Sequence, residues 1–135
     1  MRVLAVDLGF RRIGIAVGET EFSVATPRPS IAAVGKLTSD AEQVFQSYRK
    51  EQAQALVLGV PGYDDDRMEK VCRQFGAILE GRGLTVHYVD ESFTSIAAEA
   101  NLMASGLTAA GRKRKRDGEA ACQILQRFFF EAQNP

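Results

Sequence analysis

The chain has 135 residues, 45% hydrophobic and 25% charged, values typical of a globular protein whose core needs no disulfide or metal. Lysine plus arginine and aspartate plus glutamate both number 17, so overall charge does not indicate a nucleic-acid binder. No stretch reaches the roughly 20 apolar residues of a membrane span, and the start lacks a signal-peptide pattern, so we expect a single cytoplasmic domain over residues 1–135.

The first seventeen residues predict a β-hairpin with an acid at its rim. Val3–Val6 is an unbroken apolar run, typical of a strand covered on both faces, and Asp7 ends it. Gly9 can take a positive φ and turn the chain into a second apolar run, Ile13–Val17. A carboxylate beside a buried strand is costly unless it is paired, hydrogen-bonded or metal-bound, so Asp7 is the first candidate site residue.

Strands and helices alternate after the hairpin. Residues 22–31 predict a third strand, which Pro27 and Pro29 place at a sheet edge. The order strand, helix, strand that follows implies a parallel crossover, so we expect an α/β fold with a mixed five-stranded sheet, three antiparallel strands preceding the parallel ones. The remaining expected elements are a helix over Asp40–Gln52 with a Ser39/Glu42 capping box, a strand over Ala55–Val60, a helix from an Asp66/Glu69 capping box to Gly81, a strand over Leu84–Val89, a short helix from Thr94 or Ser95 to Gly106, and a final helix over Lys115–Ala132.

The segment Leu107–Arg116 is predicted to be a polar, basic connection. It holds five consecutive bases, which can bind phosphates even on a neutral protein. A solvated loop explains the same run without any function. The five are Arg112, Lys113, Arg114, Lys115 and Arg116.

Two further acidic positions lie beside apolar structure. Asp90 and Glu91 end the last predicted strand, and because both faces of that strand are apolar, alternation does not choose between them. Asp117 starts the final helix, and a helical spacing of 100° per residue predicts that it points inward, although a favourable helix dipole alone would also explain an acid there. The apolar residues on its face are Ala121, Ile124 and Phe128.

Other candidate residues have simpler structural explanations. Asp64 and Asp65 fit a turn that leads into the cap at Asp66, and His87, the only histidine, fits a packed strand position. Cys72 and Cys122 lie on apolar helix stripes and are expected to be buried free thiols.

Three carboxylates on separate elements, with bases nearby, suit a site for hard divalent cations. Mg²⁺ is commonly held by one or two carboxylates while it keeps waters and phosphate oxygens. Two such ions about 3.5–4 Å apart can activate water and stabilise the leaving oxygen of a phosphodiester. We therefore expect Mg²⁺ or Mn²⁺ as cofactor, in a two-metal site.

Four blocks of the chain together resemble the successive signatures of the YqgF family. These blocks are Val6–Ala16, Val57–Pro61, Val89–Ser95, and Lys115 with Asp117 followed by Ala120-Ala121. The family comprises bacterial RuvC-like, Holliday-junction-resolvase-like proteins with an RNase H-like fold, associated with maturation of the small-subunit ribosomal RNA precursor. The resemblance spans nearly the whole chain.

The resemblance implies that Asp7, Glu91 and Asp117 form a metal-binding acidic site, and it selects Glu91 over Asp90. This chain has Phe10 where the family usually has a small hydroxyl residue and Ser92 where it usually has arginine. After Pro61 it has Tyr63 and three aspartates in place of the usual glycine-containing turn.

The leading hypothesis is a metal-dependent endonuclease that processes the 5′ end of precursor 16S rRNA and also acts on branched DNA, as a monomer or homodimer. Asp7, Glu91 and Asp117 would hold metal, while Arg11, Arg12 and the bases at 112–116 would hold the nucleic-acid backbone. One alternative is a nucleic-acid-binding, transcription or ribosome-assembly factor without catalysis. The other is an ATPase of the actin and sugar-kinase class, which needs two lobes where 135 residues supply one.

Overall fold

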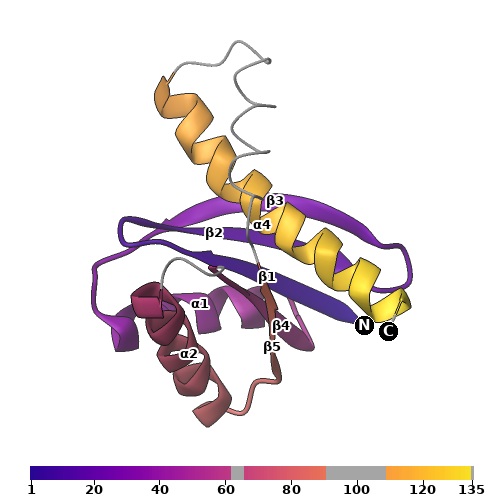
Figure 1. Cartoon of the computed structure of the whole chain (residues 1–135), viewed down its shortest axis with the longest axis horizontal. Helices are drawn as coiled ribbons and strands as arrows, with labels where there is room; N and C mark the ends of the chain where they lie inside the picture. The colour runs from indigo at the N-terminus through magenta and orange to yellow at the C-terminus, as the bar shows by residue number, and fades with distance from the viewer. Residues whose placement is uncertain (62–65, 91–108, 135) are drawn as a thin grey trace.

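The computed structural model describes residues 1–61, 66–90 and 109–134, without the side chains of 109–117. It contains a five-stranded sheet in the spatial order β3-β2-β1-β4-β5 (Figure 1). The β1/β2 and β2/β3 pairs are antiparallel, and the β1/β4 and β4/β5 pairs are parallel, which confirms the predicted mixed sheet. The strands are β1 (Arg2–Leu8), β2 (Arg12–Glu19), β3 (Val24–Ala32), β4 (Ala55–Val60) and β5 (Val86–Asp90).

Helices cover both faces of the sheet. The helices α1 (Leu37–Lys50) and α2 (Asp66–Gly81) lie on one face, and α4 (Ala109–Gln133) lies across the other (Figure 1). Among the described residues, no helix is long and apolar enough to cross a membrane.

The two cores follow from the alternation of side chains along β1. Leu4 and Val6 point into the core that β1 shares with α1 and α2, whereas Val3 and Ala5 point into the core shared with α4. All six residues of β4 are buried, as expected for a strand covered on both faces.

The β1/β2 hairpin forms as predicted, but its glycine serves a different purpose. Gly9 does not have a positive φ. A Cβ at this position would lie 2.5 Å from the carbonyl oxygen of Arg12, so the turn requires glycine for close approach of backbone. The tip is also held from outside, because the backbone N–H of Ala33 donates to the carbonyl of Arg11 (2.8 Å).

The capping box predicted for α1 is wrong. The helix begins at Leu37, its N-cap residue is Lys36, and no side chain caps it, which places Ser39 inside the first turn. Asp40 is 3% exposed and its carboxylate accepts hydrogen bonds from the backbone N–H groups of Val34 (2.9 Å) and Gly35 (3.2 Å). The acid thus holds the loop that precedes the helix.

Two other helix starts also differ from prediction. Asp66 lies in the first turn of α2 rather than at its cap, and the carboxylate of Glu69 accepts from Arg73 (3.2 Å). The helix α4 begins at Ala109 and not at the predicted Lys115, so residues 109–114 are helical and not part of a connection. The short helix predicted between residues 94 and 106 lies outside the described residues. The prediction of two buried free thiols, Cys72 and Cys122, is confirmed.

Candidate active site

The carboxyl ends of β1, β4 and β5 meet at one edge of the sheet, because these three strands are parallel. Asp7 is the penultimate residue of β1 and is half-buried. By alternation it lies on the same face as Val3 and Ala5, which pack against α4. Its cross-strand partner on β2 is Gly14, which adds no side chain on that face. The carboxylate therefore faces the α4 layer beside a neighbour that has no side chain.

A glycine on β4 also lies beside Asp7. Val6 pairs with Leu58, so Gly59 comes next along β4 at the level of Asp7. Gly14 and Gly59 belong to two of the blocks that resemble the family, and sequence reasoning missed their role. Strand register gives these glycines a role, because neither of them places a side chain next to the Asp7 carboxylate.

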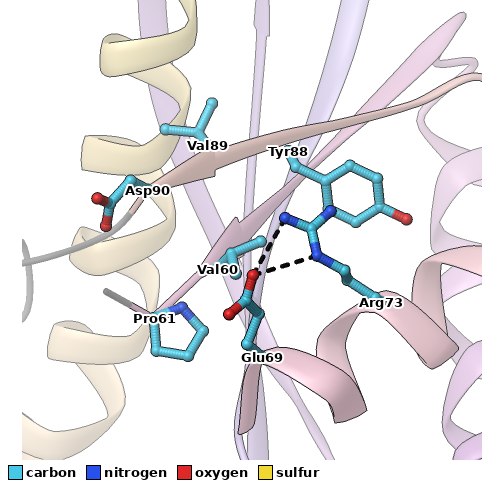
Figure 2. A pocket seen from close by; sticks show the side chains of 7 residues that line it. All are labelled: Val60, Pro61, Glu69, Arg73, Tyr88, Val89 and Asp90. Atoms are coloured by element: carbon cyan, nitrogen blue, oxygen red, sulfur yellow. Dashed lines mark hydrogen bonds and ion pairs between the residues drawn. The ribbon is translucent and has the colours of Figure 1, made fainter. Parts of the chain in front are cut away.

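Asp90 belongs by strand register to the opposite face. It pairs with Val60 and alternates with Tyr88, whose ring contributes to the core shared with α1 and α2. It is exposed and lines a cavity of about 300 Å³ together with Glu69 and Arg73 of α2 (Figure 2). By register Asp90 is therefore grouped with Tyr88 and not with Asp7, although in Figure 2 its carboxylate points away from Glu69 and Arg73. Glu91, the predicted site residue, lies outside the described residues.

The same cavity contains a small set of paired side chains. Arg73 lies over the ring of Tyr88, 5.0 Å from its centroid, and is ion-paired with Glu69 (Figure 2). Burial raises the pKa of Tyr88, with a further contribution from the carboxylate of Glu80, which accepts from the phenol at 3.2 Å. These residues satisfy one another and need no ligand.

Asp117 belongs to α4, and its side chain is not described. The stripe predicted for it is confirmed, because Ala121 and Ile124 are buried against the sheet and Phe128 is half-buried. Gly118 packs against Pro27 of β3, where a Cβ would lie 3.2 Å from the proline Cβ. Pro27 is in register, through Ala16 of β2, with Ala5 of β1. The backbone at Asp117 therefore lies over the face that carries Asp7, above β3 and close to the level of Ala5.

The predicted nucleic-acid contacts separate into two groups. Arg11 is exposed and Arg12 is half-buried, and both lie on the β1/β2 hairpin next to Asp7. The bases at 112–116 lie on α4, with side chains that are not described. In Figure 1 this N-terminal part of α4, drawn in orange, extends beyond the strands.

The described residues alone hold no group of three or more His, Cys, Asp or Glu side chains suited to a metal. Of the three acids predicted as ligands, only Asp7 has a described side chain. Its chemistry fits a hard divalent cation, because carboxylate oxygens are the ligands that Mg²⁺ and Mn²⁺ prefer. Its position also fits, half-buried at a sheet edge and flanked by glycine.

The model of the RuvX family, described as Holliday junction resolvase, matches residues 1–131 of the chain. The chain belongs to this family. The resemblance to the YqgF family is thereby confirmed.

Relatives in the RuvX family share about a third of their residues with this chain. A "Putative pre-16S rRNA nuclease" of Methylobacillus flagellatus is 36% identical over 131 residues, covering 94% of this chain and 89% of the relative. The protein of that name from Maridesulfovibrio salexigens is 33% identical over 138 residues, covering 98% and 100%.

Solved structures confirm the RNase H-like fold. RuvC of T. thermophilus in complex with a Holliday junction substrate matches with a TM-score of 0.59 and 14% identity, covering 99% of this chain and 96% of that chain. The fowlpox virus Holliday junction resolvase matches with a TM-score of 0.56 and 10% identity, covering 98% and 99%. Identities this low support the fold alone.

Proposed function

We propose that this RuvX-family protein is a cytoplasmic, metal-dependent nuclease that hydrolyses phosphodiester bonds near the 5′ end of precursor 16S rRNA, with branched DNA as a second substrate. The observation that supports it best is that the carboxylate of Asp7 and the buried stripe of α4, which follows Asp117 along the helix, occupy one face of the sheet. The names of the relatives and of the family supply the substrates.

Each predicted acid has a definite part in this proposal. Asp7, Glu91 and Asp117 would hold Mg²⁺ or Mn²⁺, which supplies Lewis-acid activation for phosphodiester hydrolysis. Asp7 comes from a strand with buried neighbours on both sides, so its position is fixed before substrate binds. Asp117 lies on a helix whose later turns are packed into the core, which fixes its backbone in the same way.

The basic residues would hold the substrate backbone. Arg11 and Arg12 lie on the hairpin that begins just after Asp7, and the bases at 112–116 immediately precede Asp117. Cations next to Asp7 and Asp117 in the sequence can bind successive phosphates and offset the repulsion between an acidic site and a polyanion. Neutralising any of them should therefore reduce the salt dependence of binding.

The decisive experiment compares two acids at the same edge of the sheet. Purified wild type, Asp117→Asn and Asp90→Asn are incubated with precursor 16S rRNA and with a four-way DNA junction, with and without Mn²⁺. We expect Asp117→Asn to lose cleavage and Asp90→Asn to keep it, because strand register groups Asp90 with Tyr88 and not with Asp7. Circular dichroism and urea unfolding should show that both variants are folded.

Two outcomes would contradict the proposal. A fully active Asp117→Asn protein would remove this residue from the site. Salt-dependent RNA binding by the wild type without metal-dependent cleavage would instead favour the non-catalytic assembly factor.

A further inference from the structure

A large aromatic side chain stands exposed at the tip of the β1/β2 hairpin. Phe10 is 73% exposed, although burying a side chain of this size is strongly favourable. Behind it lies a mainly apolar cavity of about 160 Å³ on the face of α1 and α2. Its walls include Leu8, Phe10, Leu37, Met68 and Val71, with Asp40 as a polar wall residue. An exposed ring beside an apolar cavity can bind a flat ligand.

The backbone of the hairpin tip is held by a hydrogen bond from the loop that follows β3. The carbonyl of Arg11 accepts from the backbone N–H of Ala33, and the buried carboxylate of Asp40 holds the next two N–H groups, at Val34 and Gly35. The tip is thus tied through this loop to α1. Because the platform is already ordered, a ligand would bind without the entropic cost of ordering it.

The platform lies next to the proposed catalytic edge. Phe10 is three residues after Asp7, so their Cα atoms are at most about 11 Å apart. Leu8, which lines the cavity, directly follows Asp7 and faces the other side of the sheet. Exposed Arg11 comes immediately after Phe10 and adds a positive charge. A polyanion held at Asp7 would therefore reach the apolar cavity around the hairpin tip, a path of one or two of its repeating units.

We propose that Phe10 and the cavity behind it receive one unpaired nucleobase of the nucleic acid held at Asp7. The base stacks on the Phe10 ring while its phosphate stays near Arg11. Every nucleobase has a flat π face that stacks on an aromatic side chain, and single-stranded nucleic acid is bound by aromatic rings combined with basic residues. The inference rests on the proposed nuclease function, and it adds a subsite that selects unpaired over fully paired substrate.

The test measures binding of a short single-stranded RNA in EDTA, where no cleavage intervenes. Wild type is compared with Phe10→Ser and Phe10→Leu, and Phe22→Ser is the matched control because Phe22 is 72% exposed on the β2/β3 turn at the other end of the sheet. We expect Phe10→Ser to weaken binding between about 5-fold and about 150-fold, Phe10→Leu to retain part of the affinity, and Phe22→Ser to have no effect.

A second arm identifies the base. The RNA is prepared with a single abasic nucleotide at each position in turn. Wild type should lose affinity at one position only, and Phe10→Ser should be indifferent to the abasic nucleotide there, because the two changes remove the same interaction. All variants should unfold at the urea concentration of the wild type, since the side chain is exposed.

Three results would overturn the inference: equal affinities for Phe10→Ser and Phe22→Ser, an abasic effect that persists in Phe10→Ser, and no binding of the RNA by wild type. If one of these results were found together with metal-dependent cleavage, the proposed nuclease function would be supported and the base subsite would be refuted. Position-dependent binding without cleavage in any metal would support the base subsite and contradict the nuclease.

Discussion

Replacing Asp40 tests whether a buried carboxylate holds the loop between β3 and α1. In Asp40→Ala two hydrogen bonds from backbone N–H groups to a charged acceptor are lost, each worth about 1.5–3 kcal/mol. The two donors belong to the exposed residues Val34 and Gly35, so water can replace the carboxylate as their acceptor. The loss in free energy of unfolding should therefore lie near the lower end of that range. We expect the free energy of unfolding to fall by about 2–4 kcal/mol. Asp40→Asn should fall by about half of that, because its amide oxygen can accept from only one donor while its NH₂ group faces the other.

Urea unfolding followed by circular dichroism measures this loss, with Glu42→Ala as the control. Glu42 is on the same helix, and its ion pair with Arg82 has side chains 44% exposed on both partners, so its loss should change stability far less. An Asp40→Ala protein as stable as Glu42→Ala would refute the idea that the acid fixes the loop. The proposed base subsite makes a linked prediction: because the same loop holds the hairpin tip, Asp40→Ala should weaken RNA binding when folded.

Two further predictions concern close packing and a buried thiol. Gly18→Ala should lower the free energy of unfolding in urea by about 1–3 kcal/mol or more, because the new Cβ would lie 2.2 Å from the carbonyl oxygen of Val24. The control Gly81→Ala has open space around the new Cβ and should be neutral or slightly stabilising. Equal stabilities for the two would contradict the close approach of β2 and β3 at Gly18. Burial, assisted by the charge of Glu119, raises the pKa of Cys122 to about 11. At pH 8 only about one Cys122 thiol in a thousand is therefore ionised, and iodoacetamide should label it only when the protein unfolds. Rapid labelling of the native protein would show that the thiol is accessible.

The sheet could be predicted from the sequence because its inner strands have a simple signature. Val3–Val6 and Ala55–Val60 are unbroken apolar runs, and both form strands that are buried on two faces. A strand with this pattern must lie inside the sheet, and the prolines of β3 favour the edge position that this strand has. Burial and edge position therefore fixed most of the topology without tertiary information.

Helix starts were harder to predict, for a physical reason. Ser39 and Glu42 have the spacing of a capping box, but the contact that decides the structure is between Asp40 and the loop before the helix. Local spacing cannot reveal a side chain that reaches backward to a preceding segment. Similarly, the polar residues at 109–116 suggested a loop, yet they continue a helix whose later turns are anchored in the core.

The choice between Asp90 and Glu91 shows what register adds. Both faces of the last strand are apolar, so alternation in the sequence does not show which of the two acids lies on the face of Asp7. The structure assigns a helix layer to each face: Tyr88 packs towards α2, Val89 packs towards α4, and Asp90 belongs with Tyr88. Register thereby groups Asp90 with Tyr88 and not with the residues on the face of Asp7, a result that the sequence alone could not supply.

The continuity of α4 links the stability of the core to the geometry of the proposed site. Asp117 and the bases before it belong to α4 and not to a strand of the sheet. Their positions therefore depend on how the later turns of the same helix pack against the sheet. Those turns are fixed by Ile124 and Leu125, both fully buried, and by Phe129, 3% exposed. The turns of a continuous helix, which rises 1.5 Å per residue, move together. A shift of one of these side chains in the core therefore also moves the backbone at Asp117 with respect to Asp7. In the proposed site, the position of Asp117 therefore depends on apolar packing under α4 as well as on the acids themselves.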